Sequence, residues 1–151
     1  MVERFVSDPL ELAPIVRAGA FSRADVVLYG VDHSGPSYEG RVYLDDPAAD
    51  PGSGRQAQRY AGSFHIFGHG GCFGDLGHCH LPSGPRNPFD LRSAHQLVPQ
   101  IKPVIITEAL KRVVAGAPDK TSVTVTVVAV VPGPASNDVL MFDEVRLLTY
   151  L

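Results

Sequence analysis

The segment TSVTVTVVAVV at residues 121–131 constrains the fold of this chain more than any other feature. Val123, Val125 and Val127 alternate with threonine, and a period of two places the valines on one face of an extended strand. Branched β-carbons also suit the pleated backbone of a strand. The segment is therefore the most clearly marked strand in the sequence.

Five other segments have the β-branched and aromatic composition or the alternation of strands. They are residues 24–32, 37–45, 59–69, 97–106 and 139–150. The short turn HSGP separates the first two, so we expect them to form a hairpin. Pro99 and Pro103 have no backbone N–H to donate, which favours an edge position for 97–106.

The strand at 59–69 is expected to have two distinct faces. Tyr60, Phe64 and Ile66 would share one face, and His65 would lie on the opposite one. We interpret His65 as a hydrogen-bonded histidine of the interior, because buried polar side chains are nearly always satisfied there.

One helix is expected at about residues 107–116. Thr107 is typical of an N-cap, and Gly116 stands where a helix often ends in a left-handed residue. The apolar stripe of the helix consists of Leu110, Val113 and Val114.

The order of these elements predicts a mainly β protein. Strands and helices do not alternate along the chain, which argues against a parallel α/β sheet. We expect an antiparallel β-sandwich or a jelly-roll-like barrel with the one short helix. Residues 1–23 would form an N-terminal extension and residues 24–151 a single β-sandwich domain. The glycine- and proline-rich stretch 45–58 is expected to be an exposed loop.

Length and charge exclude several functional classes. A chain of 151 residues, 44% of them hydrophobic, can bury the core of one domain. A formal net charge of -3, with no basic cluster, argues against a nucleic-acid partner. No apolar run reaches the roughly 18 residues of a membrane span, and no signal peptide is visible, so we expect no membrane partner and a cytoplasmic location.

The segment HGGCFGDLGHCH at 69–80 contains both cysteines of the chain and three of its six histidines. If the backbone is extended there, His78 and His80 project to the same side, with Cα atoms about 7 Å apart. Cys72 can return toward them because the intervening glycines are conformationally permissive. A set of His69, Cys72, His78 and His80 could close around copper or zinc, which select imidazole and thiolate ligands. Cys79 is the fifth residue of metal-ligand type in this segment.

Other interpretations of the two cysteines stay open. The loop between them is long enough for a Cys72–Cys79 disulfide, which would need oxidising surroundings. Both could instead be reduced and packed as small apolar groups. A catalytic Cys79–histidine pair is disfavoured, because sequence neighbours on a strand point in opposite directions. A small hydrolase is kept as an alternative.

Three stretches follow one another in a recognisable order. They are RVYLDD at 41–46, YAGSFHIFGH at 60–69, and ITEALKRVVAGAPDKTSVTVTVVAV at 106–130. An AGSF strand thus ends in a histidine, and a helix beginning I-T-E then precedes a strand of valine and threonine. This ordered set resembles the C-terminal domain of plant-type polyphenol oxidases and related tyrosinases.

The resemblance implies an accessory role rather than a catalytic one. In that family the domain is a β-sandwich that shields the dinuclear copper site of the oxidase and performs no oxidation. This chain has no helix with histidines at i, i+4 spacing, so it is not expected to be a type-3 copper oxidase itself. The resemblance implies a tyrosinase-like copper oxidase as partner, in cis or in trans.

The 69–80 segment is the departure from that family, which offers no role for Cys72, His78, Cys79 or His80. We interpret the chain as an accessory domain that shields the oxidase or helps to load it with copper, with this segment as its candidate copper or zinc site. Two alternatives stand beside this hypothesis: a free-standing copper- or zinc-binding β-domain, and a small metal-dependent enzyme.

Overall fold

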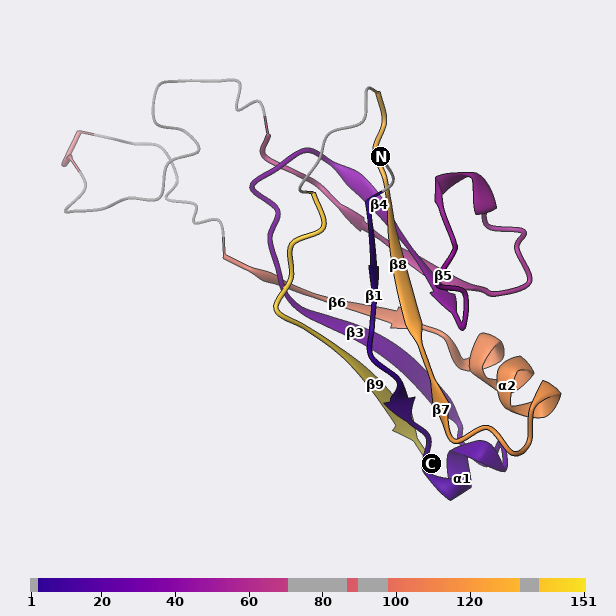
Figure 1. Cartoon of the computed structure of the whole chain (residues 1–151). Helices are drawn as coiled ribbons and strands as arrows, with labels where there is room; N and C mark the ends of the chain where they lie inside the picture. Colours follow the sequence, from indigo (N-terminus) through magenta and orange to yellow (C-terminus); the bar gives the residue numbers. More distant parts are fainter. Residues whose placement is uncertain (1–2, 71–86, 90–97, 134–138) are drawn as a thin grey trace.

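The computed structural model describes residues 3–70, 87–89, 98–133 and 139–151, and these form a mainly β molecule (Figure 1). The strands are β1 (Arg4–Val6), β2 (Leu10–Glu11), β3 (Arg23–Val31), β4 (Tyr38–Leu44), β5 (Tyr60–Ile66), β6 (Gln100–Ile105), β7 (Ser122–Val123), β8 (Val125–Val130) and β9 (Glu144–Tyr150). The helices are α1 (Pro14–Arg17), the single 3-10 turn η1 (Pro51–Ser53), and α2 (Thr107–Gly116).

The described strands form three antiparallel sheets. The largest has the order β1-β8-β4-β5, the second β6-β3-β9, and β2 pairs with β7 in a short third sheet. The two larger sheets remain open and share one apolar core. The expected antiparallel β-sandwich is therefore confirmed, and within the described residues the strands do not close into a barrel.

The core lies between the inner faces of the two larger sheets. Val26 and Leu28 of β3 meet Val42 and Leu44 of β4 and Val127 of β8 in one cluster, and all five are fully buried. Burying an aliphatic side chain of this size contributes roughly 1.5–3 kcal/mol. These contacts between sheets hold the sandwich together.

The valine–threonine segment forms the strand that the sequence marks most clearly, but it is divided in two. Val123 belongs to β7, while Val125 and Val127 belong to β8, which lies between β1 and β4. Thr126 on the other face is also fully buried. Strand β8 is therefore covered on both faces.

The expected hairpin between 24–32 and 37–45 is wrong. Strand β3 pairs with β6 and β9, and β4 pairs with β5 and β8. Each of the two strands has an apolar inner face, and the faces meet across the core instead of lying side by side in one sheet. The HSGP turn therefore carries the chain from one sheet to the other (Figure 1).

Strand β5 contains a bulge that changes one predicted face. Val42 pairs with Gly62 but Tyr43 pairs with Tyr60, so Ala61 is an extra residue. The bulge moves Tyr60 to the outer face, against Tyr43, whereas Phe64 stays in the core as predicted.

The 45–58 stretch is only partly the exposed loop that the sequence suggests. Ala49 is 1% exposed and packs in a small outer cluster with Tyr43 and Val128. The hydroxyl of Tyr43 donates to the carbonyl oxygen of Gly54 at 2.9 Å. The loop thus covers the outer face of the larger sheet.

Helix α2 has the predicted bounds, and its predicted apolar stripe is buried. Its ends differ from expectation. Thr107 is the first helical residue, and its Oγ1 accepts from the backbone N–H of Ala24 at 3.0 Å, which joins α2 to the start of β3. Gly116 is the last helical residue, so it is not the left-handed residue that follows a helix. The C-cap is Ala117, which has a φ of -149°.

The stretch before residue 24 contributes to the sheets and the core. Phe5 of β1 pairs with Val127, and Val16 of α1 is buried. Pro14 is the first residue of α1, where its missing N–H has no intrahelical partner to lose. The predicted edge position of β6 is confirmed. None of the described helices has the length and apolar character of a membrane span.

Gly40 on β4 is required by packing. A β-carbon there would overlap the ring of Phe64 on the neighbouring strand. We expect Gly40→Ala to lower the free energy of unfolding by about 1–3 kcal/mol, because overpacking displaces a buried ring. Urea-induced unfolding measures the change.

Gly116→Ala is the matched control, since a β-carbon at the end of α2 meets nothing within 4 Å. It should raise the free energy of unfolding by up to about 1 kcal/mol, because alanine is the better helix former. A loss of stability of the same size in both variants would contradict the packing argument.

Candidate functional site

Two segments far apart in the sequence meet beyond the ends of β4 and β5. The backbone N–H of His69 donates to the carbonyl oxygen of His33 at 3.0 Å, and that of Gly70 to Gly35 at 2.7 Å. The N–H of Gly68 donates to the Ser37 hydroxyl at 3.0 Å. These bonds hold residues 67–70 against the turn that leads from β3 to β4.

Glycine makes this approach possible. A β-carbon on Gly68 would collide with the backbone of Gly35 and Pro36, and one on Gly70 would lie 2.7 Å from the carbonyl carbon of Gly35. Real β-carbons are not found so close to another backbone, so both positions need the smallest residue. The site therefore depends on glycines placed after the AGSF strand.

His33 is buried where the two segments meet, with only 8% of its surface exposed. Its Nε2 lies 2.9 Å from the carbonyl oxygen of Val98, just before β6. Its Nδ1 is buried and has no hydrogen-bond partner among the residues that the structure describes. We call the group formed by His33, His69 and Val98 the histidine corner.

The ring of His69 packs beside that of His33. The ring centroids are 5.0 Å apart, and the ring planes meet at 73°. Nδ1 of His69 lies 3.3 Å from the carbonyl oxygen of His33. The fold thus brings together two imidazoles that are 36 residues apart in the sequence.

The structure describes one of the five predicted metal ligands, His69. The other four, Cys72, His78, Cys79 and His80, lie outside the described residues. Among the residues that are described, no group of three or more histidine, cysteine or acidic side chains could hold a metal ion. The predicted five-residue site stays a prediction.

Two other histidines differ in exposure. His65, expected in the interior, is exposed on β5. His33, in the HSGP turn, is buried. The local sequence pattern could not predict that His33 is buried, because the residues that surround it, 67–70 and Val98, are distant from it in the sequence. The glycines in both segments allow two backbones to approach closely, but they do not show which segments will meet.

A carboxylate stands next to the histidine corner in the chain. The backbone N–H of Ser34 donates to Asp32 Oδ1 at 2.7 Å. Hydrogen bonds from the Ser34 backbone and side chain, with a smaller contribution from His33, lower the pKa of Asp32. Asp32 therefore carries a negative charge at neutral pH, which favours a cation nearby.

Exposed apolar side chains flank the corner. Phe67 is 82% exposed, and its ring centroid lies 6.4 Å from that of His69. Val98, whose carbonyl contacts His33, is 59% exposed. Contiguous exposed apolar patches mark contact sites for other proteins, and Phe67 and Val98 are the two exposed apolar side chains described beside the corner.

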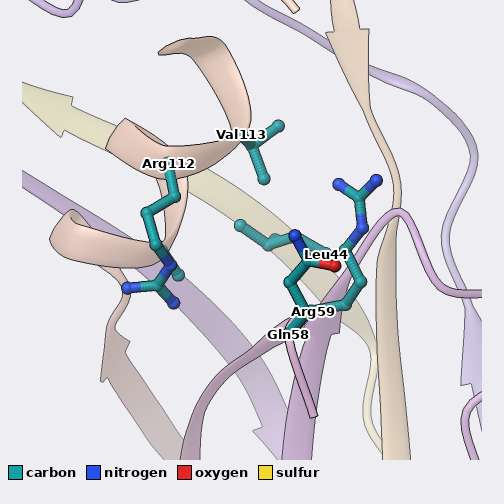
Figure 2. Close-up of a pocket in the computed structure, with 6 residues that line it drawn as sticks. Leu44, Gln58, Arg59, Arg112 and Val113 are labelled. Atoms are coloured by element: carbon teal, nitrogen blue, oxygen red, sulfur yellow. The ribbon is translucent and has the colours of Figure 1, made fainter. Parts of the chain in front are cut away.

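A second candidate is a pocket of about 60 Å³ between the end of β4, the residues just before β5, and α2 (Figure 2). Its lining residues are Leu44, Gln58, Arg59, Ala109, Arg112 and Val113. Arg112 Nη2 donates to the carbonyl oxygen of Tyr60 at 3.4 Å. Neither arginine of this pocket is paired with a carboxylate in the part of the chain that the structure describes.

Arg41 and Arg55, by contrast, share one carboxylate partner. Glu39 binds Arg41 at 3.1 Å and Arg55 at 2.8 Å. Arg59 and Arg112 could therefore attract an anion. However, Figure 2 shows their guanidinium groups on different sides of the pocket, with Gln58 between them, so they do not form a clamp around one carboxylate. The histidine corner is the stronger candidate.

No protein-family model and no curated protein matches this sequence. Solved structures of latent aurone synthase, a polyphenol oxidase, do match its fold. The recombinantly expressed enzyme matches with a TM-score of 0.54 and 11% sequence identity, over 98% of this chain and 24% of that chain. The enzyme from the natural source matches with a TM-score of 0.52 and 13% identity, over 99% and 24%.

At this identity the comparison shows the fold alone. The chain spans about a quarter of the length of the polyphenol oxidases that it matches. The strands and helix of this protein therefore have the arrangement of a region within a polyphenol oxidase.

The glycine contacts of the histidine corner can be tested directly. Gly68→Ala should separate 67–70 from the turn and break the bond from the His69 N–H to His33. We expect faster hydrogen exchange of the His69 and Gly70 amides, measured by NMR. Gly35→Ala is the control, because a β-carbon there meets nothing within 4 Å. Equal exchange in both variants would show that the glycine contact is unimportant.

The partly buried pairing of Glu39 predicts a pH dependence of stability. Burial alone would raise the pKa of Glu39, but hydrogen bonds from Arg55 and Arg41 and their charges outweigh it and lower the pKa. A lowered pKa in the folded state adds stability above the ordinary value of 4.5, and this stability is lost as the pH falls through the folded value.

Glu39→Gln should therefore destabilise the protein at pH 7, and the difference from the unmodified chain should shrink below pH 4, as measured by urea unfolding across the pH range. Glu144→Gln is the control. Glu144 also pairs with an arginine, Arg146, but both side chains are about half exposed. Solvent screens such a pair, so Glu144→Gln should change the free energy of unfolding only slightly. An equal effect of the two variants would argue against burial as the cause.

Proposed function

We propose that this protein is a non-catalytic accessory domain of a tyrosinase-like copper oxidase, joined to it in cis or acting in trans. It shields the oxidase or assists its loading with copper. The observation that carries the proposal is the fold match, which includes nearly the whole of this chain but only 24% of a polyphenol oxidase. A domain of this kind leaves the oxidation chemistry to the rest of such a protein.

The ordered resemblance to the C-terminal domain of polyphenol oxidases supports the same role. The AGSF stretch forms β5, the I-T-E stretch forms the entry to α2, and the valine–threonine stretch forms β7 and β8. All three stretches thus correspond to regular elements of the sandwich.

The metal site of the proposal is the Cys/His segment, with His69, Cys72, His78, Cys79 and His80 as ligands for copper or zinc. Its first ligand, His69, follows β5 and lies beside the turn after β3. A site at the rim can receive an ion and release it to a partner more readily than one in the core.

In this proposal the oxidase contacts the accessory domain at Phe67 and Val98. Both are largely exposed next to His69 and His33, so a partner that covers them would also cover these two histidines. Apolar anchors beside a site of exchange would exclude water from the transfer of a bound ion.

Metal binding by the purified chain tests the first part of the proposal. Under reducing conditions we expect one copper(I) or zinc ion per chain, measured by competition with a chromophoric chelator. Cys72→Ser and His78→Asn should each weaken binding by at least about tenfold, because each removes a ligand. His65→Asn, which changes an exposed histidine on β5, should have no effect. Absence of stoichiometric binding by the unmodified chain would refute the metal site.

Association with the oxidase tests the second part. The chain should co-purify with the tyrosinase-like oxidase encoded beside it or in the same reading frame, and it should change the copper content or activity of that oxidase. Phe67→Ser should weaken the association, because it removes an exposed anchor. Ile15→Ser on α1, at the opposite end of the molecule, should not (Figure 1). If both variants associate equally, the contact surface lies elsewhere.

A further inference from the structure

We propose that the outer face of the sheet β6-β3-β9 is a dimer interface, and that its partner is a second copy of this chain. The inner face of this sheet packs in the core, so the outer face is the one that a partner can reach. The inference does not rest on the proposed function, because it uses other side chains than the histidine corner and needs no metal.

An exposed apolar stripe runs along β6 on this face. Val104 is buried in the core, and the residues on either side of it point outward, because side chains alternate along a strand. Ile101, Pro103 and Ile105 therefore share the outer face, and the two isoleucines are 60% and 62% exposed. Val27 of β3 lies directly opposite Pro103 and extends the stripe to the middle of the sheet. A contiguous apolar surface of this kind is typical of a contact with another protein.

The charges on the same face are paired within the chain. On β9, Arg146 Nε lies 2.7 Å from Glu144 Oε1, and on β3, Arg23 Nε lies 2.8 Å from Asp25 Oδ1. These four side chains cancel in charge, although the whole chain has a formal net charge of -3. A neutral face does not repel a second copy of itself, and it offers no net attraction to a strongly charged partner.

The order of the charges makes the face complementary to its own copy. Identical chains in a dimer are related by a two-fold axis, so each contact occurs twice. An axis that lies between two stacked faces and crosses β9 at Val145 stacks each strand antiparallel on its counterpart. Arg146 of one copy is then opposite Glu144 of the second copy, and Glu144 is opposite the second Arg146. The two β6 strands also stack, so the apolar stripes meet.

The edge of the sheet favours stacking over the addition of a strand. Pro103 stands within β6, which is an edge strand among the described residues. Proline has no backbone N–H to offer to a further strand, and edges that carry it are protected from such pairing. The apolar side chains of β6 are therefore expected to be covered by a face and not by a neighbouring strand.

Sedimentation equilibrium of the full chain tests the interface. We expect a reversible dimer, with the mass of one chain at low concentration and of two chains at high concentration. Ile105→Lys should weaken association by at least about tenfold, because it places a charge in the apolar stripe of both copies. Val6→Lys is the matched control. Val6 is 38% exposed on β1 of the larger sheet, so the variant should dimerise as the unmodified chain does.

Charge reversal tests the position of the axis. Arg146→Glu sets carboxylates opposite each other across the interface and should weaken the dimer. Glu144→Arg combined with Arg146→Glu restores the complementary order and should recover it. If the double variant associates no better than Arg146→Glu alone, this two-fold arrangement is wrong.

The outcomes also separate this inference from the proposed function. A chain that stays monomeric up to about 1 mM would overturn the dimer. So would association that Ile105→Lys leaves unchanged, or that Val6→Lys weakens equally. If the chain is monomeric but Ile105→Lys loses the oxidase, the face binds the oxidase and not a second copy.

The unmodified chain gives a measurement that does not depend on the folding of any variant. On dilution, the NMR amide resonances of Ile101 and Ile105 should shift, and that of Val6 should not. Shifts confined to other parts of the molecule would contradict the interface.

Discussion

The shared core between the two sheets is the interaction on which the rest of the structure depends. Strands β3 and β4 are joined by one short turn, yet each presents its apolar face to the other across the core. Burial of these faces, and not local pairing, decides that the chain crosses from one sheet to the other at this turn. The turn is consequently held at the rim of the sandwich, where its backbone groups need partners from another segment.

That need is met by the residues after β5, and the result is the histidine corner. The carbonyl oxygens of His33 and Gly35 accept from His69 and Gly70, because glycine at 68 and 70 lets the two backbones approach. Satisfying the backbone of a crossing turn thus places two imidazoles side by side. A structural requirement and the candidate site arise from the same contacts.

The proposed role as an accessory domain is consistent with where polarity and exposure are found. The middle of the sandwich is apolar, and α2 closes one part of it. The histidine corner and the exposed Phe67 and Val98 lie together at the rim. A domain that passes an ion to a partner would need its ligands and its contact surface at one place, and the proposed role puts both at this rim.

Much of the fold could be predicted from the sequence, because it is expressed in short-range patterns. The valine–threonine alternation, the prolines of β6 and the apolar stripe of α2 each report local geometry, and the structure confirms all three. The errors have one origin. Thr107 bonds to Ala24 instead of capping its own helix, and a bulge turns Tyr60 to the outer face. These outcomes depend on neighbours in space.

The same division applies to the candidate site. Sequence alone marked His69 as a ligand, because it begins a segment dense in cysteine and histidine. Only the tertiary structure revealed His33, since its burial, its bond to Val98 and its contact with His69 come from three separate parts of the chain. The sequence by itself determined which segments become strands and which residue types can bind a metal. The tertiary structure decided which of them meet, because only packing across the core brings distant segments within bonding distance.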